Sequence, residues 1–332
     1  MFNKRKDAYY CYDVTNYMRI FPYIFKRRCD SLVFYEIEFD ITNLVRFVKE
    51  YNRQHKEEFD EYNRTHDDKK FPLRLTTAIL IVYARVLAIR PKLNRFIKNK
   101  KLWQRKEISQ VFIVKKSFTE EAPELSEELV FDKFGTFDSY VQLIESYINR
   151  CETSDIDELN RNDMVVGALF RFLPKWLLQL AVGIVGFKDR ITGMGKWLHQ
   201  TDCLHSSVFT ANLSSLGISD SAPHHHLYEW GTTSIFTILG PVRRIRKQDA
   251  DKSDYKDTIK IGLTVDERIC DGFYFVKSMR IVGDFMENPE KLLHVPAPEE
   301  IPHLMTKKEY KANIKARKKA LKEKKRARRA QS

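Results

Sequence analysis

The sequence has few cysteines, and none of them stands in a metal-binding pattern. It contains five among 332 residues, and no two are spaced as in the CxxC motifs of zinc sites and thiol redox centres. An odd number of cysteines also argues against a framework of disulfides. We therefore expect reduced thiols and no bound metal.

Long apolar runs are also missing. The N-terminal residues MFNKRKD are basic, but no apolar signal-peptide core follows them. The most apolar segment, residues 164–187, is interrupted by Arg171, Pro174 and Lys175, whereas a membrane-spanning helix needs roughly 20 predominantly apolar residues. We expect this insert to form two short amphipathic helices that meet near Pro174, buried or on a hydrophobic surface. The broken pattern favours burial or a partner over membrane contact. Because no signal-peptide core follows the N-terminal residues, we expect a cytoplasmic protein.

No glycine-rich phosphate loop and no internal repeat is present. The single Gly-x-Gly, formed by Gly193 and Gly195, lacks the rest of a dinucleotide-binding fingerprint. Chemistry that depends on a bound nucleotide is therefore not expected.

Positive charge is abundant but concentrated at one end of the chain. Residues 307–332 hold 13 of the 58 Lys and Arg residues and only two Glu, so they account for nearly all of the net charge of +13. This basic tail favours helix but has almost no apolar stripe. It is suited either to salt-sensitive contact with RNA, anionic lipid or an acidic protein, or to a disordered solubilising role.

Between these ends, strand-like and helix-like patterns alternate. We expect an acidic loop over residues 120–128 and a helix end plus surface loop over residues 52–70. Strands are expected at residues 32–39, 108–118, 207–213, 233–239 and 258–265, the last three in one sheet, and helices from Asp40, at residues 76–89, at residues 137–149 after a Thr136 cap, and from Gly272 to Asn288.

The most specific motif is VDERICDG at residues 265–272, where a strand passes into a helix. It resembles the D-H-R-x-x-D-G or H-H-x-x-x-D-G signature of dihydrolipoyl acyltransferase catalytic domains and chloramphenicol acetyltransferases. Four further features agree in order: RPKLN at residues 90–94, LSSLG at 213–217, ILG at 238–240 and PVRR at 241–244. The resemblance spans roughly residues 20 to 295. It implies an α/β fold, a two-layer sandwich of a mixed sheet and helices, extended here by the basic helical tail.

In that family a histidine takes the proton from a thiol, and a hydroxyl holds the oxyanion that develops when the thiolate attacks an acyl carbonyl. The resemblance places Ser214 at the hydroxyl position and Glu267 at the position of the base. Glutamate departs from the family pattern, because its pKa of about 4.3 suits a thiol less well than that of histidine at about 6.5. Burial could raise the pKa of Glu267, whereas an inward-pointing Arg268 would lower it. The alternative is a salt-bridged carboxylate in a site that has lost catalysis.

A second source of a base is the triplet of His224, His225 and His226. His225 is the candidate among them, but a structural role is favoured, and the sequence offers no further ligands to complete a metal site. The resemblance makes Asp271 a scaffold residue that pairs with an arginine, and Gly272 a residue that lets the backbone turn sharply. Cys270 has no adjacent histidine and is expected to be a buried, unreactive thiol.

The resemblance implies an acyltransferase that uses an acyl-coenzyme A thioester at a site shared between subunits of a homotrimer. We expect an N-terminal extension at residues 1–20, the acyltransferase-like domain at residues 21–300 and the basic tail at residues 307–332. No lipoyl domain or swinging linker precedes the domain, so no covalent lipoyl group is expected. The rival hypothesis is a catalytically inactive scaffold that docks on an anionic partner or membrane surface through its tail.

Overall fold

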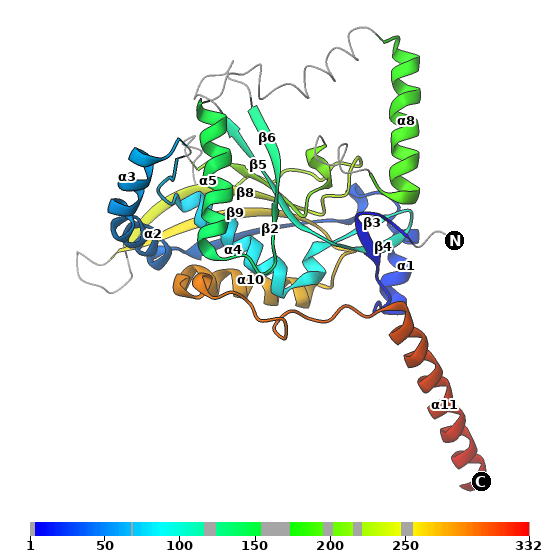
Figure 1. Cartoon of the computed structure of the whole chain (residues 1–332). Helices are drawn as coiled ribbons and strands as arrows, with labels where there is room; N and C mark the ends of the chain where they lie inside the picture. The colour runs from blue at the N-terminus through cyan, green and yellow to red at the C-terminus, as the bar shows by residue number, and fades with distance from the viewer. Residues whose placement is uncertain are drawn as a thin grey trace.

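A six-stranded mixed sheet organises the molecule (Figure 1). The structure is a computed structural model and describes residues 4–67, 69–115, 124–153, 173–194, 202–214, 221–246 and 255–331. The strand order is β2-β9-β8-β7-β5-β6. The strands are β2 (Leu32–Asp40), β5 (Ile108–Lys115), β6 (Glu124–Phe131), β7 (Val208–Asn212), β8 (Ile235–Arg246) and β9 (Tyr255–Asp266).

Strand direction in this sheet decides where the loops lie. β7 runs parallel to β5 and β8, whereas β9 is antiparallel to both β8 and β2. The C-terminal end of β7 therefore lies beside Leu239, in the middle of β8, whereas the C-terminal end of β9 lies beside Ile235, at the start of β8. Residues that follow β7 and residues that follow β9 therefore lie toward opposite ends of the sheet.

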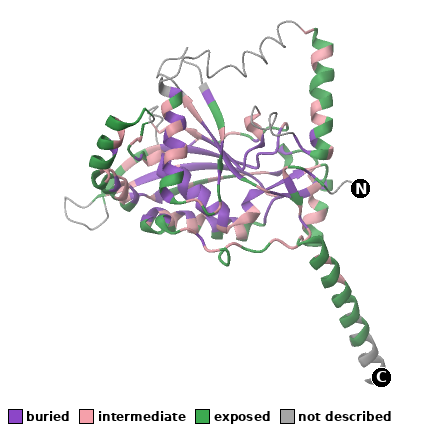
Figure 2. Cartoon of the chain, viewed as in Figure 1, coloured by how far each residue is buried: buried purple, intermediate pink, exposed green. Residues whose placement is uncertain are grey.

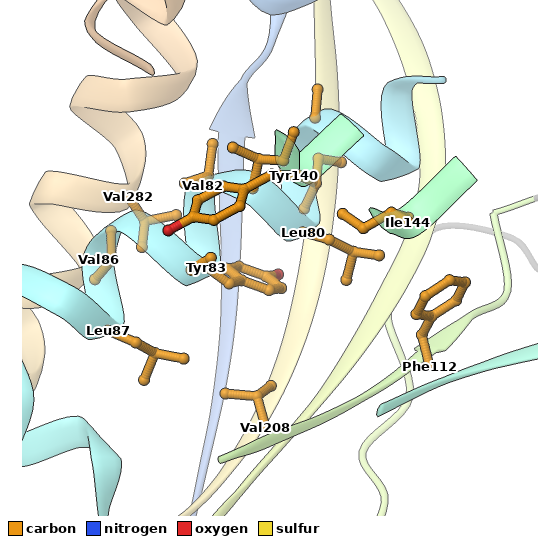
Figure 3. Packing of buried hydrophobic residues seen from close by; sticks show 14 of the residues in the cluster. Leu80, Val82, Tyr83, Val86, Leu87, Phe112, Tyr140, Ile144, Val208 and Val282 are labelled. Atoms are coloured by element: carbon orange, nitrogen blue, oxygen red, sulfur yellow. The ribbon is translucent and has the colours of Figure 1, made fainter. Parts of the chain in front are cut away.

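Helices cover one face of the sheet and complete a two-layer sandwich. The central one is α4, which is apolar almost all round and buried along its length, as a helix enclosed between a sheet and other helices must be (Figure 2). Its side chains, such as Leu80 and Tyr83, meet those of Tyr140 and Ile144 in the main core (Figure 3). The helices of this layer are α2 (Thr42–Gln54), α4 (Leu75–Ile89), α5 (Phe137–Thr153) and α10 (Gly272–Glu287).

Most of the expected elements are present, and the expected fold class is confirmed. The strands that we expected near residues 207–213, 233–239 and 258–265 do share one sheet. Thr136 caps α5, since its hydroxyl accepts a hydrogen bond from the Ser139 amide at 3.2 Å. The first half of the expected 164–187 insert lies outside the described residues. Its second half forms α8 (Lys175–Thr192), which starts directly after Pro174.

Two expected loops are wrong. Residues 124–131 form β6, which pairs with β5 along its whole length and buries Leu125, Leu129 and Phe131. Residues 56–65 form the polar helix α3 (Lys56–Thr65), which is fixed to α2 through Phe59, its one buried side chain. In both segments charged residues obscure the few apolar ones that pack.

A small sheet and three helices stand on one side of the sandwich. A small sheet of order β1-β4-β3 is built from β1 (Ala8–Tyr10), β3 (Arg95–Lys98) and β4 (Lys101–Arg105). Beside it lie the short helix α1 (Asn16–Ile24), the projecting helix α8 and the long basic helix α11 (Lys307–Gln331) (Figure 1). Within the described parts of the chain, no helix has the length and apolar character needed to cross a bilayer.

Candidate functional site

The turn that follows β9 is held by a buried ion cluster. Asp266 is fully buried and accepts hydrogen bonds from Arg268 at 2.7 and 2.8 Å, while the Nε atom of Arg28 lies 3.9 Å from the same carboxylate. Arg268 also donates to the Phe25 carbonyl at 2.9 Å, just beyond α1. Charges buried this well need partners, so these arginines fix both the turn and the neighbouring loop.

Asp271 lies at the start of the helix that follows this turn. Its carboxylate accepts a hydrogen bond from the Tyr274 amide at 2.8 Å and so caps the N-terminus of α10. In the described part of the chain no arginine pairs with Asp271; the arginines contact Asp266 instead. Gly272 has no left-handed φ, and an added Cβ would meet nothing within 4 Å, so the turn itself does not require glycine.

Glu267 lies at the wall of a cavity of about 430 Å³, a volume within the range of small-molecule sites. The Glu267 side chain is half-buried, and its amide donates to the Ser31 carbonyl at 3.0 Å. The remaining wall is largely apolar and aromatic, with contributions from α1, β2 and α10. These residues include Tyr17, Met18, Phe21, Val33, Tyr35 and Phe275.

Two cations, Lys92 and Arg95, also line this cavity. The guanidinium of Arg95 lies 3.2 Å from the carboxylate of Asp13 and donates to Gln104 at 3.0 Å, so its position is fixed. The ammonium of Lys92 lies 4.9 Å from the ring centre of Tyr274. The cavity thus combines an apolar floor with two positive groups and three carboxylates, those of Asp13, Glu267 and Asp271.

Two further side chains at the cavity, Cys270 and Tyr35, are neutral near pH 7. Burial, together with the adjacent Asp271, raises the pKa of the Cys270 thiol to about 12, so Cys270 is not a nucleophile here. Burial, with Cys270 and Glu267 nearby, also raises the pKa of Tyr35, which leaves its hydroxyl protonated and able to donate.

Ser214 does not lie in this cavity within one chain. It follows β7, where its hydroxyl donates to the Asn212 side chain at 2.6 Å. Asn212 is level with Leu239 of β8, and Leu239 is level with Ile261 of β9. Glu267 stands six residues beyond Ile261, a separation of roughly 20 Å at about 3.3 Å per strand residue. One chain therefore cannot bring the two side chains together.

His225 is also absent from the cavity that Glu267 lines. Its ring stacks on Phe236 at 4.3 Å, on the sheet face opposite to the helices, and its Nδ1 atom lies 2.7 Å from the His226 carbonyl. The neighbouring His224 contacts the Tyr35 carbonyl through Nε2 at 2.9 Å. Among the described residues no group of His, Cys, Asp and Glu could hold a metal ion.

Solved structures of similar shape identify the fold. The cubic core of the pyruvate dehydrogenase multienzyme complex superposes with a TM-score of 0.52 and 12% identity, over 84% of this chain and 89% of that one. A probable dihydrolipoamide acetyltransferase from Listeria monocytogenes gives 0.51 and 12%, over 83% and 93%. A chloramphenicol acetyltransferase gives 0.48 and 10%, over 83% and 97%. No family model matches the chain, and no curated protein matches it in sequence.

The chain has the chloramphenicol acetyltransferase-like fold. The fold was predictable from the motif at residues 265–272, but the cavity that Glu267 lines has a wall that the motif did not reveal. The residues missed are those of α1 and the cations Lys92 and Arg95. The amphipathic spacing of α1, with Met18 and Phe21 on one face, was the available signal for that wall.

Proposed function

We propose that this protein is an acyltransferase that moves an acyl group between a coenzyme A thioester and an acceptor. The observation that carries the proposal is the position of Glu267, which lines a cavity of about 430 Å³ at the strand-to-helix turn of an acyltransferase fold. The likeness to acetyltransferase cores adds support at the level of the fold. In the proposed reaction Glu267 accepts the proton of the attacking thiol, and the resulting thiolate adds to the acyl carbonyl. The C–S bond of the original thioester then breaks, and the departing thiolate takes the proton back from Glu267.

The proposed site is completed by Ser214 of a neighbouring copy, in a homotrimer. Because roughly 20 Å separates Ser214 and Glu267 along the strands of one chain, only a second chain can bring a Ser214 hydroxyl to this Glu267 to donate to the oxyanion. Apolar side chains border the cavity and suit such a contact: Tyr17 and Ile20 on α1 and Phe273 on α10 are each more than half exposed.

The charge of the cavity suits coenzyme A. Its thioesters carry phosphates, and Lys92 and Arg95 place two cations in the wall of the cavity, which is largely apolar elsewhere. The described residues offer no metal-binding cluster, and the proposed proton transfer uses only side chains of the chain itself.

The test is thioester exchange with acetyl-coenzyme A and a small thiol acceptor. We expect slow turnover by the wild type, because a carboxylate is a weaker base than imidazole, and a loss of about 100-fold or more in both Glu267→Gln and Ser214→Ala. Glu267→His is expected to raise the rate, since its pKa lies closer to that of a thiol. The matched control is Glu287→Gln, at the far end of α10.

A non-catalytic role is the competing function, and the replacement of the family histidine by Glu267 is the observation that favours it. The enzymatic proposal is refuted if the wild type and the Glu267→His, Glu267→Gln and Ser214→Ala variants are all inactive while acetyl-coenzyme A still binds. These results would leave an acyl-binding scaffold as the function.

A further inference from the structure

Helix α8 presents an apolar stripe to solvent. Trp176, Leu180, Ile184 and Phe187 follow one another at spacings of four, four and three residues, so they lie on one face of the helix. Each of these side chains is between 52% and 66% exposed. Exposed apolar side chains of this size, gathered on one element, mark a surface that is covered in use (Figure 2).

The helix cannot fold back to cover this stripe, because its C-terminal end is fixed to the body. Asp189 is almost completely buried and contacts Arg5 at 2.8 Å, Lys98 at 2.6 Å and His205 at 3.5 Å. The Lys6 amide also donates to the Thr192 carbonyl at 3.0 Å. The last turn is therefore rigidly placed, while the preceding turns project from the sandwich (Figure 1).

The charges around the stripe are almost all positive. On α8 itself Lys175, Lys188 and Arg190 are exposed, whereas the one acidic residue, Asp189, is buried in its ion cluster. An apolar stripe flanked by lysine and arginine is the pattern of helices that lie in the interface of an anionic bilayer.

The positive surface continues from α8 to the basic tail. Lys6 contacts the end of α8, and Lys4 lines the same cavity as Lys307, the first residue of α11. The start of α11 is held in place by Tyr310, whose ring lies 5.5 Å from that of Tyr12 and 5.3 Å from the Arg19 guanidinium. Helices α8 and α11 thus stand on the side of the molecule where the N-terminus lies (Figure 1).

We propose that this side of the protein docks on an anionic lipid bilayer, with the α8 stripe inserted among the lipids and the basic tail bound to the headgroups. An apolar element and a polybasic segment are the two signals that stable peripheral binding needs, since each alone gives weak attachment. A lipid surface offers apolar chains to the α8 stripe and negative headgroups to the tail, whereas RNA or an acidic protein segment offers contacts to the tail alone. No membrane-spanning helix is required.

The experiment is flotation of the full chain with vesicles of phosphatidylcholine alone or mixed with phosphatidylserine. Binding is expected to the mixed vesicles and to fall with added salt. The variant Leu180→Ser with Ile184→Ser is expected to bind at least about tenfold more weakly, because both exposed side chains lose their apolar contact with lipid. Gln179→Ser, exposed on the same helix but outside the stripe, is the matched control and is expected to bind as the wild type does.

Removal of residues 307–332 is expected to weaken binding to the mixed vesicles about tenfold or more and to reduce its salt dependence, since only the cations near the α8 stripe remain. The proposal is overturned if the wild type binds neither kind of vesicle, even where its tail binds RNA. It is also overturned if the double serine variant floats as well as the control, or if that variant changes the oligomeric state, which would make a second copy the occupant. Since Gln179, Leu180 and Ile184 do not line the Glu267 cavity, thioester exchange is expected to be unchanged in their variants.

Discussion

His205 is completely buried between two carboxylates. Its Nε2 atom lies 3.5 Å from Asp189 and its Nδ1 atom 3.2 Å from Asp202. Burial alone would lower the pKa of His205, but hydrogen bonds and charge from both carboxylates outweigh burial and raise it. Burial alone would also raise the pKa values of Asp189 and Asp202. The contacts of His205 with both carboxylates, and those of Lys98 and Arg5 with Asp189, outweigh burial and hold both pKa values below their ordinary range.

These shifts predict how stability depends on pH. The contribution of His205 is fully present below its unfolded pKa of about 6.5 and is lost as the pH rises through its higher folded value. The contribution of Asp189 and Asp202 is present above about pH 4 and is lost as the pH falls through their lower folded values. The ion cluster at the base of α8 is therefore strongest in mildly acidic solution.

The variant His205→Gln tests this prediction. We expect it to lower the free energy of unfolding by about 3 kcal/mol at mildly acidic pH, because buried carboxylates lose a partner. The difference between wild type and variant should shrink as the pH rises above neutrality. Urea unfolding at several pH values measures it, and a difference that grows with pH would contradict the raised pKa.

The two aspartates of the 265–272 motif also differ in their expected importance. Asp266→Asn leaves Arg28 and Arg268 buried without a carboxylate, and we expect a loss of about 3 to 5 kcal/mol in unfolding free energy. Asp271→Ala removes only a helix cap, at a cost of about 1 kcal/mol, and Asp271→Asn keeps the cap. Equilibrium urea unfolding of the three variants ranks them, and equal damage by Asp266→Asn and Asp271→Asn would show that both aspartates hold the turn.

At the scale of elements, the sequence predicted those that bury a regular apolar pattern. Helix α4 and strand β9 were expected within a few residues of their actual bounds, because their side chains are buried along most of the element. Strand β6 was missed because Glu127 interrupts the alternation of Leu125 and Leu129; in the structure Glu127 pairs with Arg150 of α5 at 2.9 Å. Only the fold reveals that this carboxylate has a partner 23 residues away.

The candidate site was also predictable only in part, because some of its contacts join segments that are distant in the sequence. The 265–272 motif located Glu267 at a turn, since strand and helix signals meet there. The motif could not reveal that α1 covers the cavity or that Arg95 is fixed by Asp13, because those contacts join segments that are distant in sequence. The resemblance implied an arginine contact for Asp271, and the motif gave no sign that Arg28 and Arg268 contact Asp266.

At the scale of the whole molecule, the separation of Ser214 from Glu267 is the feature with the sharpest consequence. β7 and β9 run in opposite directions, so residues that follow their C-terminal ends lie toward opposite ends of the sheet. A closed ring of copies, each offering its β7 end to the β9 end of the next, would bring one of each together at every interface.

This arrangement predicts complementation between two inactive variants. Glu267→Gln and Ser214→Ala subunits, each inactive alone, are expected to regain a fraction of the wild-type exchange rate when they are co-expressed with different tags and purified through both. A mixed ring contains interfaces at which an intact Glu267 meets an intact Ser214, whereas a ring of one variant contains none. The control is the same pair of variants purified separately and combined without exchange of subunits, which should remain inactive. If the co-expressed pair is as inactive as either variant while the wild type turns over, Ser214 is not the hydroxyl donor. Another group must then stabilise the oxyanion, and the protonated Tyr35, which lines the same cavity, is a candidate.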